Sequence, residues 1–144
     1  MQLEDYIKEQ VHKFYWEDDY NCATTTLKTL SNIYKIELDP QVVNAAKGMH
    51  GAGKYGAQCG LVEGVLMFIG IYGTQYGFNH ANIVRNCYQF AEKFELNFNS
   101  LKCSDLRAGS FKKTDAPHLC EKLTCEALMF AHNHIVEISI DLLY

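Results

Sequence analysis

The chain has 144 residues, which is enough for one domain with a buried core, and its two prolines are few for an all-β protein. Charged residues make up 21% and the net charge is −4, so the basic surface of a nucleic-acid-binding protein is not expected. The first ten residues, MQLEDYIKEQ, are acidic and amphipathic, unlike a secretory signal, and a cytoplasmic location is the default expectation. Six cysteines in such a chain favour reduced thiols, metal ligands or redox groups over structural disulfides.

The first part of the chain has helical periodicity in three segments. Apolar residues recur every three to four positions over residues 3–15, which predicts an amphipathic helix. A second helix, capped by Asp19 or Asn21, is expected to continue to about residue 34. The Asp-Pro pair at 39–40 is a suitable N-cap and first residue for a short third helix that ends near residue 49.

The stretch from 48 to 73 combines a glycine-rich loop with an apolar helix. Four glycines in nine residues predict a tight loop whose backbone can take positive φ: Gly48, Gly51, Gly53 and Gly56. The apolar run 59–73 is shorter than the ~20 residues that span a bilayer, so it predicts a buried central helix. Within it Gly60 and Gly64 are four positions apart and share one face, which lets a neighbouring helix come close.

The last part of the chain predicts two more helices and an ambiguous end. Asn79 caps a fifth helix to about residue 94, with Cys87 in its apolar stripe. Residues 97–113 are less regular, with a brief helical turn expected after Cys103, and a sixth helix begins at 115–117, with Cys125 on its other face. Residues 135–144 fit either a strand or a terminal helix. The sequence therefore predicts an all-α fold, a single bundle of about six helices around the central helix 59–73, in one domain spanning 1–144.

Four of the six cysteines fall in or just before the first turn of a predicted helix: Cys22, Cys59, Cys103 and Cys120. A helix N-terminus carries about +0.5 of a charge and unpaired N–H groups, so it favours a thiolate. Four such ends would supply roughly +2, comparable to the roughly −2 of a four-thiolate iron–sulfur site. The alternative is four buried small apolar residues, because the chain has no CxxC pair and no ferredoxin or zinc-ribbon spacing. Any site must therefore be assembled by the tertiary fold.

Several short motifs together carry a resemblance to a known family. They are CGLVEG at 59–64, the preceding GxGKYGAQ, NCA at 21–23, the LKC that ends at Cys103, and the later Cys120. This ordered set resembles the C_GCAxxG_C_C family of redox-active proteins, whose members are about this long, helical, and carry four characteristic cysteines with a CGAxxG-type motif. Similar domains occur attached to cytochrome-type electron carriers with an iron–sulfur centre. The resemblance covers most of the chain and assigns the family's cysteines to Cys22, Cys59, Cys103 and Cys120.

Two departures from the family pattern concern the size and charge of the site. Leu61 stands where the family usually has alanine, and Ala57 where an acidic residue is common. Neither departure removes a thiol, but each alters how a cofactor or partner would fit. The resemblance thus implies a redox role without specifying a reaction.

The residues around Cys59 are candidates for binding a cofactor. Gly51, Gly53 and Gly56 leave N–H groups uncovered, and such groups form concave nests that suit anions, so the glycine loop is expected to form the wall and entrance of the cysteine site. Lys54 would add positive charge at the rim, and Tyr55 would cover the site from solvent.

Glu63 and the histidines are the remaining polar candidates near the cysteines. Glu63 is a carboxylate in an apolar helix and needs a partner, either a lysine or backbone group of another helix or the proton of Cys59. His50 lies in the glycine loop and His118 lies two residues before Cys120, so an additional ligand or a proton donor is one interpretation of either; we favour a partly exposed structural role for each of the six histidines.

Three functions remain open at this point. The first is an electron-transfer module whose four cysteines bind an iron–sulfur cluster. The second is a thiol–disulfide protein with reversible pairs, Cys22 with Cys59 and Cys103 with Cys120. The third is a non-redox helical domain with a structural zinc or a buried thiol cluster. A redox role implies an electron-transfer partner that the sequence does not identify; neither nucleic acid nor a membrane span is expected, and a homodimer is left open.

Overall fold

The computed structural model describes residues 1–107 and 112–141, and in this part of the chain it contains helices and no β-strand. The helices are α1 (Leu3–Trp16), α2 (Cys22–Ile33), α3 (Pro40–Ala45), α4 (Gly51–Lys54), α5 (Gly60–Gln75), α6 (His80–Phe98), α7 (Cys103–Leu106) and α8 (Glu121–Asp141), and the 3-10 turn η1 (Pro117–Cys120) directly precedes α8. The all-α fold expected from the sequence is confirmed. None of the described helices has both the length and the apolar character that crossing a bilayer requires.

The helices differ from the expected set mainly in the short segments. Five of them are long, and α3, α4 and α7 are single turns or little more. The third helix ends at Ala45 rather than near residue 49, and the glycine loop contains the short α4. The ambiguous end of the chain is helical as far as Asp141, because α8 continues through it, and residues 142–144 lie outside the described part.

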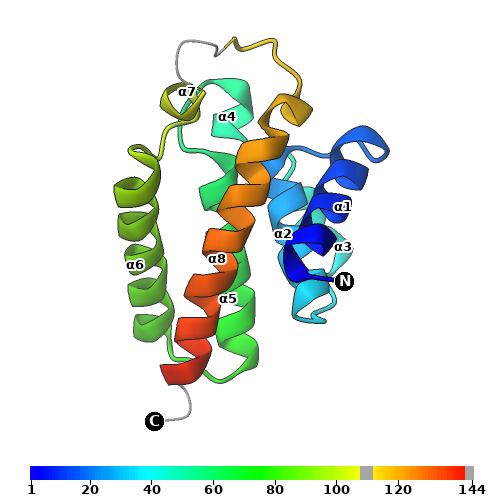
Figure 1. Ribbon diagram of the computed structural model, residues 1–144. Coiled ribbons are helices and arrows are strands. Elements are labelled where there is room, and N and C mark those ends of the chain that lie inside the picture. The colour runs from blue at the N-terminus through cyan, green and yellow to red at the C-terminus, as the bar shows by residue number, and fades with distance from the viewer. Residues whose placement is uncertain (108–111, 142–144) are drawn as a thin grey trace.

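The long helices run in two directions, so several of them start at the same end of the bundle. Figure 1 shows α2, α5 and α8 starting at the upper end, next to α4 and α7, while α1 and α6 run the opposite way. Two of these starts are capped by side chains: Asn21 accepts from Thr24 N–H in α2, and Cys59 accepts from Leu61 N–H in α5. The upper end therefore gathers three helix N-termini, which favour negative charge.

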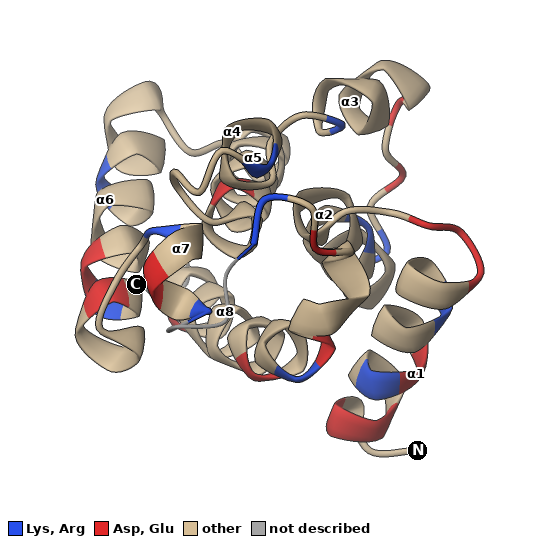
Figure 2. Cartoon of the chain, turned by 90° about the horizontal axis from the view of Figure 1, so that it is seen from above, with Lys and Arg blue, Asp and Glu red and all other residues tan. Residues whose placement is uncertain are grey.

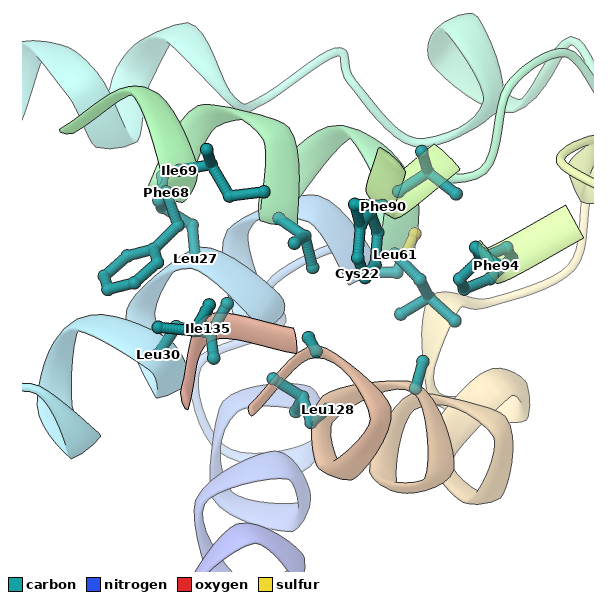
Figure 3. Packing of buried hydrophobic residues seen from close by; sticks show 14 of the residues in the cluster. Cys22, Leu27, Leu30, Leu61, Phe68, Ile69, Phe90, Phe94, Leu128 and Ile135 are labelled. Atoms are coloured by element: carbon teal, nitrogen blue, oxygen red, sulfur yellow. The ribbon is translucent and has the colours of Figure 1, made fainter. Parts of the chain in front are cut away.

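The core lies between α2, α5, α6 and α8. In Figure 3 the labelled side chains of these four helices point toward one another. Fully buried members of this core include Leu27 and Leu30 of α2, Leu61, Phe68 and Ile69 of α5, Phe90 and Phe94 of α6, and Leu128 and Ile135 of α8. Burying each such side chain stabilises the fold by about 1.5–3 kcal/mol before entropy is counted.

The central helix is less enclosed than the sequence predicts. The stripe formed by Glu63, Leu66, Met67, Gly70 and Ile71 is half-buried, although the rest of α5 up to Gly73 is buried. The reason is that α5 packs against three long helices, α2, α6 and α8, and the stripe faces the remaining side. The expectation of a helix buried on every side is therefore corrected to one with a half-buried face.

The closest helix pair is α2 with α5, and two glycines of α5 permit it. A Cβ atom on Gly64 would lie 2.6 Å from the Ala23 carbonyl oxygen and 3.0 Å from Thr26 Cβ. A Cβ atom on Gly60 would overlap Cys22 Sγ and lie 2.8 Å from the Ala23 backbone nitrogen. Real Cβ atoms do not approach so closely, so the face shared by Gly60 and Gly64 is where the α2 backbone rests on α5, as the spacing predicts.

Replacing Gly64 by alanine should destabilise the protein, with Gly70 of the same helix as the matched control. Gly64→Ala forces α2 away from α5 and should lower the free energy of unfolding by about 1–3 kcal/mol, the usual cost of overpacking. Nothing lies within 4 Å of a Cβ at Gly70, so Gly70→Ala should raise stability by about 0.5–1 kcal/mol through helix propensity. Urea unfolding of both variants measures the difference, and equal effects would contradict the close packing.

Candidate functional site

A short antiparallel bridge places Cys59 next to Cys103. The Cys59 N–H donates to the Leu101 carbonyl and the Cys103 N–H donates to the Ala57 carbonyl, both at 2.8 Å. Gln58 and Lys102 are the bridge pair between these two hydrogen bonds. Gly51 packs on the other side of Cys103, since a Cβ on that glycine would lie 3.0 Å from Cys103 Cβ. Two cysteines that are distant in the sequence are thus fixed by backbone contacts.

Asn21 fixes the start of α2 and the segment before α4. Its side-chain oxygen caps α2 by accepting from Thr24 N–H at 2.8 Å. Its side-chain nitrogen lies 2.8 Å from the Lys47 carbonyl, 3.2 Å from the Ala46 carbonyl and 3.0 Å from His50 Nδ1. Asn21 therefore ties the first turn of α2, which carries Cys22, to the chain that carries His50.

Cys22 and Cys59 are buried thiols in direct contact. Cys22 is the first residue of α2 and is 7% exposed, and Cys59 is the N-cap of α5 and is 4% exposed. Cys22 Sγ lies against Gly60, the residue after Cys59, and is thus placed to donate a hydrogen bond to the Cys59 sulfur, which accepts from Leu61 N–H at 3.4 Å. The Cys59 sulfur is thus an acceptor of hydrogen bonds, and Cys22 is one of its donors.

This hydrogen bond separates the acidities of the two thiols. Donation by Cys22, helped by the backbone N–H groups of Leu61 and Val62, lowers the pKa of Cys59 below its ordinary value of 9.0, although burial opposes it. The same hydrogen bond, together with burial and the charge of Cys59, raises the pKa of Cys22 well above that value. The pair therefore loses its first proton readily and its second with difficulty, and Cys59 holds the resulting charge.

Cys103 and Cys120 lie on the outer side of the same site. A cavity of about 30 Å³ is lined by Cys22, Cys103 and Cys120. Burial raises the pKa of Cys103 to about 11, with smaller effects of the charges on Cys59 and Cys120. Burial also raises the pKa of Cys120. All four thiols therefore influence one another electrostatically, and the outer two are half-buried.

Basic residues surround this cavity and partly offset its negative charge. Lys54, Arg107 and Lys112 line it together with Asp115. Arg107 forms an ion pair with Asp115 at 3.0 Å and donates a hydrogen bond to Cys120, and its charge lowers the pKa of both Cys103 and Cys120 against the effect of burial. Figure 2 looks onto this end of the bundle and shows basic segments near α4, α7 and the chain that leads to η1.

The buried hydroxyl groups of Tyr15 and Thr124 form a hydrogen-bond chain to the backbone of Cys120. Thr124 Oγ donates to the Cys120 carbonyl at 2.8 Å, which uses its one proton, so the Tyr15 hydroxyl is the donor in the 2.7 Å contact with Thr124 Oγ. Burial raises the pKa of Tyr15 well above its ordinary value, and charges on Cys22, Cys120 and Cys59 add to this. Tyr15 therefore stays protonated and stabilises the turn that carries Cys120.

Not all loop residues expected at the site reach it. Gly51 touches Cys103 and Lys54 lines the cavity, whereas Gly53 and Gly56 do not line it. Gly53 has open space around it, and its φ of 64° explains the need for glycine. Tyr55 is 71% exposed, with Lys113 above its ring. The expectation that Tyr55 covers the thiols from solvent is therefore wrong.

Glu63 and the other cysteines lie apart from the cavity. Glu63 accepts a hydrogen bond from the Gln58 side chain, so its partner is neither a lysine nor a group of another helix. The negative charge of Glu63 raises the pKa of Cys59. Cys87 donates to the Leu66 carbonyl at 3.9 Å, and Cys125 lines a groove between α1 and α8. The structure thus separates Cys87 and Cys125 from the four other thiols.

Among the histidines, only His50 lines the thiol cavity. Burial and the charge of Lys54 lower the pKa of His50, so it is neutral at neutral pH. His118 stacks on Trp16, with ring centroids 4.1 Å apart, instead of facing Cys120. His134 is buried and its Nε2 contacts the Asn86 carbonyl at 3.2 Å. Of the two histidines considered near the cysteines, His50 is therefore the one that the fold places at the thiol cavity.

The arrangement of the thiols does not fit an iron–sulfur cluster without rearrangement. A volume of about 30 Å³ corresponds to about one water molecule. Within residues 1–107 and 112–141, no three His, Cys, Asp or Glu side chains are placed to hold a metal ion. All six cysteines are free thiols. Three of the four clustered thiols line this cavity, and all four affect one another's pKa values through their charges.

Sequence reasoning missed three residues of the site: Asn21 as the tether of His50, Tyr15, and Arg107. Arg107 follows Cys103 by four positions, and this spacing places both on one face of a helical turn, which is a usable signal. Asn21 was recognised as a cap, but its contacts with residues 46–50 depend on the tertiary fold. The same holds for Tyr15, whose partner Thr124 lies on α8.

A comparison with protein families matches residues 20–134 of the chain, a span that contains all four clustered cysteines. The matching family model is described as "Putative redox-active protein (C_GCAxxG_C_C)". No curated protein and no solved structure gives a match. Because the family model covers well over half of the chain, the protein belongs to the C_GCAxxG_C_C family of redox-active proteins.

Proposed function

We propose that the chain is a thiol–disulfide redox protein with an inner pair, Cys22 and Cys59, and an outer pair, Cys103 and Cys120. The observation that carries this proposal is the packing of two buried cysteines: Cys22 Sγ lies against Gly60, the residue that follows Cys59. Two thiols placed side by side in this way need little movement to form a disulfide. A lowered pKa marks Cys59 as the better leaving group when that disulfide is opened, since thiols of lower pKa leave faster.

The position of Cys22 gives the order of the exchange steps. Cys22 lines the cavity with both outer thiols, whereas Cys59 does not line it. In the oxidised inner pair, the Cys120 thiolate attacks Cys22 Sγ, forms a Cys120–Cys22 disulfide and releases Cys59 as a thiolate. Cys103 then loses its proton and attacks Cys120 Sγ, which forms Cys103–Cys120 and releases Cys22. One disulfide has moved and no external electrons are needed.

Each surrounding group has a defined part in this exchange. Arg107 favours the attacking thiolate of Cys120 by its charge and hydrogen bond. Leu61 N–H stabilises the departing thiolate of Cys59. The half-buried outer pair then exchanges with an external dithiol or disulfide, which receives or supplies two electrons. The inner pair stays protected from solvent by its burial.

Redox titration of the reduced chain tests the pairing. The protein is equilibrated in buffers of graded thiol–disulfide potential, the remaining thiols are alkylated after acid quenching, and peptides are mapped by mass spectrometry. We expect thiols to disappear two at a time, with Cys22 linked to Cys59 and Cys103 linked to Cys120. Cys59→Ser should abolish the inner link, and Cys87→Ser on α6 should leave both links intact. Random pairing that involves Cys87 or Cys125 would contradict the proposal.

Removing the hydrogen-bond donor should raise the pKa of Cys59. In Cys22→Ala the largest effect that lowers this pKa is lost while burial remains, so Cys59 should ionise at a higher pH than in the parent chain. The pH dependence of Cys59 alkylation, followed by peptide mass, gives both midpoints. Cys125→Ala serves as the control and should leave the midpoint unchanged. An unchanged midpoint in Cys22→Ala would show that the two thiols are not in contact.

A four-thiolate iron–sulfur centre is the second candidate function. The gathering of three thiols and three basic residues around one cavity, with Cys59 next to Cys22, favours it, while the small volume of the cavity counts against it. Anaerobic purification with iron, zinc and acid-labile sulfide analysis separates the candidates. Stoichiometric iron and sulfide with protection of all four cysteines would replace the thiol–disulfide proposal, and stoichiometric zinc would favour a structural metal site.

A further inference from the structure

A larger cavity of about 380 Å³ lies directly beside the thiol cavity. Three residues line both cavities: His50, Lys54 and Pro117. These residues form a wall shared by the two cavities, so a molecule in the larger cavity would contact residues that also line the thiol cavity. The volume is within the range of pockets that hold small molecules. We name this larger cavity the side pocket.

The charged groups of the side pocket favour an anion. Lys47 and Lys54 line it, and Asp19 is the acidic residue in its lining, so the charge is positive when His50 is neutral. None of the ion pairs between described residues involves Lys47 or Lys54. Both lysines are therefore able to pair with a bound anion without breaking an internal ion pair.

The backbone around the side pocket is held in place rather than left to move freely. Four consecutive residues, Gly51 to Lys54, have positive φ angles of 66°, 54°, 64° and 70°. For Ala52 and Lys54 this left-handed conformation costs roughly 1–2 kcal/mol each, so surrounding contacts must maintain it. Asn21 holds the Lys47 carbonyl and His50 on the opposite side. The backbone that carries both lysines is thus held by specific contacts and by its own conformation.

We propose that the side pocket binds the external substrate, a small disulfide or thiol that carries a carboxylate or phosphate group. This inference rests on the proposed thiol–disulfide function. The anion lies between Lys47 and Lys54, and the sulfur atoms reach the outer pair past His50. A reduced outer pair then converts R–S–S–R into two R–SH, with formation of the Cys103–Cys120 disulfide; two electrons pass to the substrate and the two thiol protons end on the products.

Three small disulfides of similar shape and different charge test this assignment: dithiodipropionate is anionic, hydroxyethyl disulfide is neutral and cystamine is cationic. Each is mixed with the reduced full chain in a Cys87→Ala/Cys125→Ala background, and thiol loss is followed by quenching and intact mass. The rate for each variant is expressed relative to the same disulfide with the parent chain, so differences in leaving-group pKa cancel.

Lys47→Met and Lys54→Met should each slow the reaction with dithiodipropionate about fivefold relative to the reaction with hydroxyethyl disulfide, because one unit charge is removed within several ångströms of the anion. The reaction with cystamine should become faster in the same variants. Lys122→Met on α8, which lines a different groove, should leave all three relative rates unchanged and controls for net charge. Slowing of the dithiodipropionate reaction by acetate would assign a carboxylate site and slowing by inorganic phosphate a phosphate site, and either result supports the proposal.

The outcomes separate failure of this inference from failure of the proposed function. If the parent chain reacts with the disulfides but Lys47→Met and Lys54→Met change the three rates equally, the side pocket is not the substrate site and the thiol–disulfide function stands. If the parent chain forms no Cys103–Cys120 disulfide with any of the three, both are overturned.

Discussion

The contact between the α2 backbone and the first turn of α5 is the interaction on which the site depends. Gly60 has no Cβ, and Cys22 Sγ occupies the place where that atom would be. Gly64, one turn later, allows the Ala23 carbonyl to approach in the same way. This contact brings the first residue of α2 against the N-cap of α5, and so it brings two buried thiols together. The short bridge at Gln58 and Lys102 then adds Cys103 to the same end of the bundle.

Opposing effects of burial and hydrogen bonding give the four thiols different properties. Burial raises the pKa of a thiol, and it dominates at Cys103 and Cys120 even beside Arg107. Only at Cys59 do hydrogen bonds outweigh burial, because one comes from Cys22 and others come from the first turn of α5. The N-terminus of a helix therefore matters here through specific N–H groups at one thiol, rather than as an equal field on all four.

Much of the fold and part of the site could be predicted from the sequence. Apolar periodicity and the caps at Asn21 and Asn79 locate the long helices, and the glycine spacing in α5 predicts its close neighbour. The selection of four cysteines follows from their positions at predicted helix starts. The left-handed turn at Gly51 to Lys54, the bridge to Lys102 and the contacts of Asn21 with residues 46–50 were not predictable, because each depends on contacts between segments distant in sequence or on backbone angles that sequence patterns do not specify. The half-buried face of α5 was missed for a related reason, since an apolar run does not reveal how many neighbours cover it.

We propose that the missing Cβ of Gly60 allows the Cys22–Cys59 contact and thereby the inner disulfide. The direct measurement compares Gly60→Ala with Gly70→Ala, a change on the same helix with open space around it. Each variant is confirmed to be folded by circular dichroism and then oxidised, and the linked peptides are quantified by mass spectrometry. We expect Gly70→Ala to form the Cys22–Cys59 link as the parent chain does, and Gly60→Ala to lose most of it while keeping Cys103–Cys120. Undiminished Cys22–Cys59 linkage in folded Gly60→Ala would contradict the account.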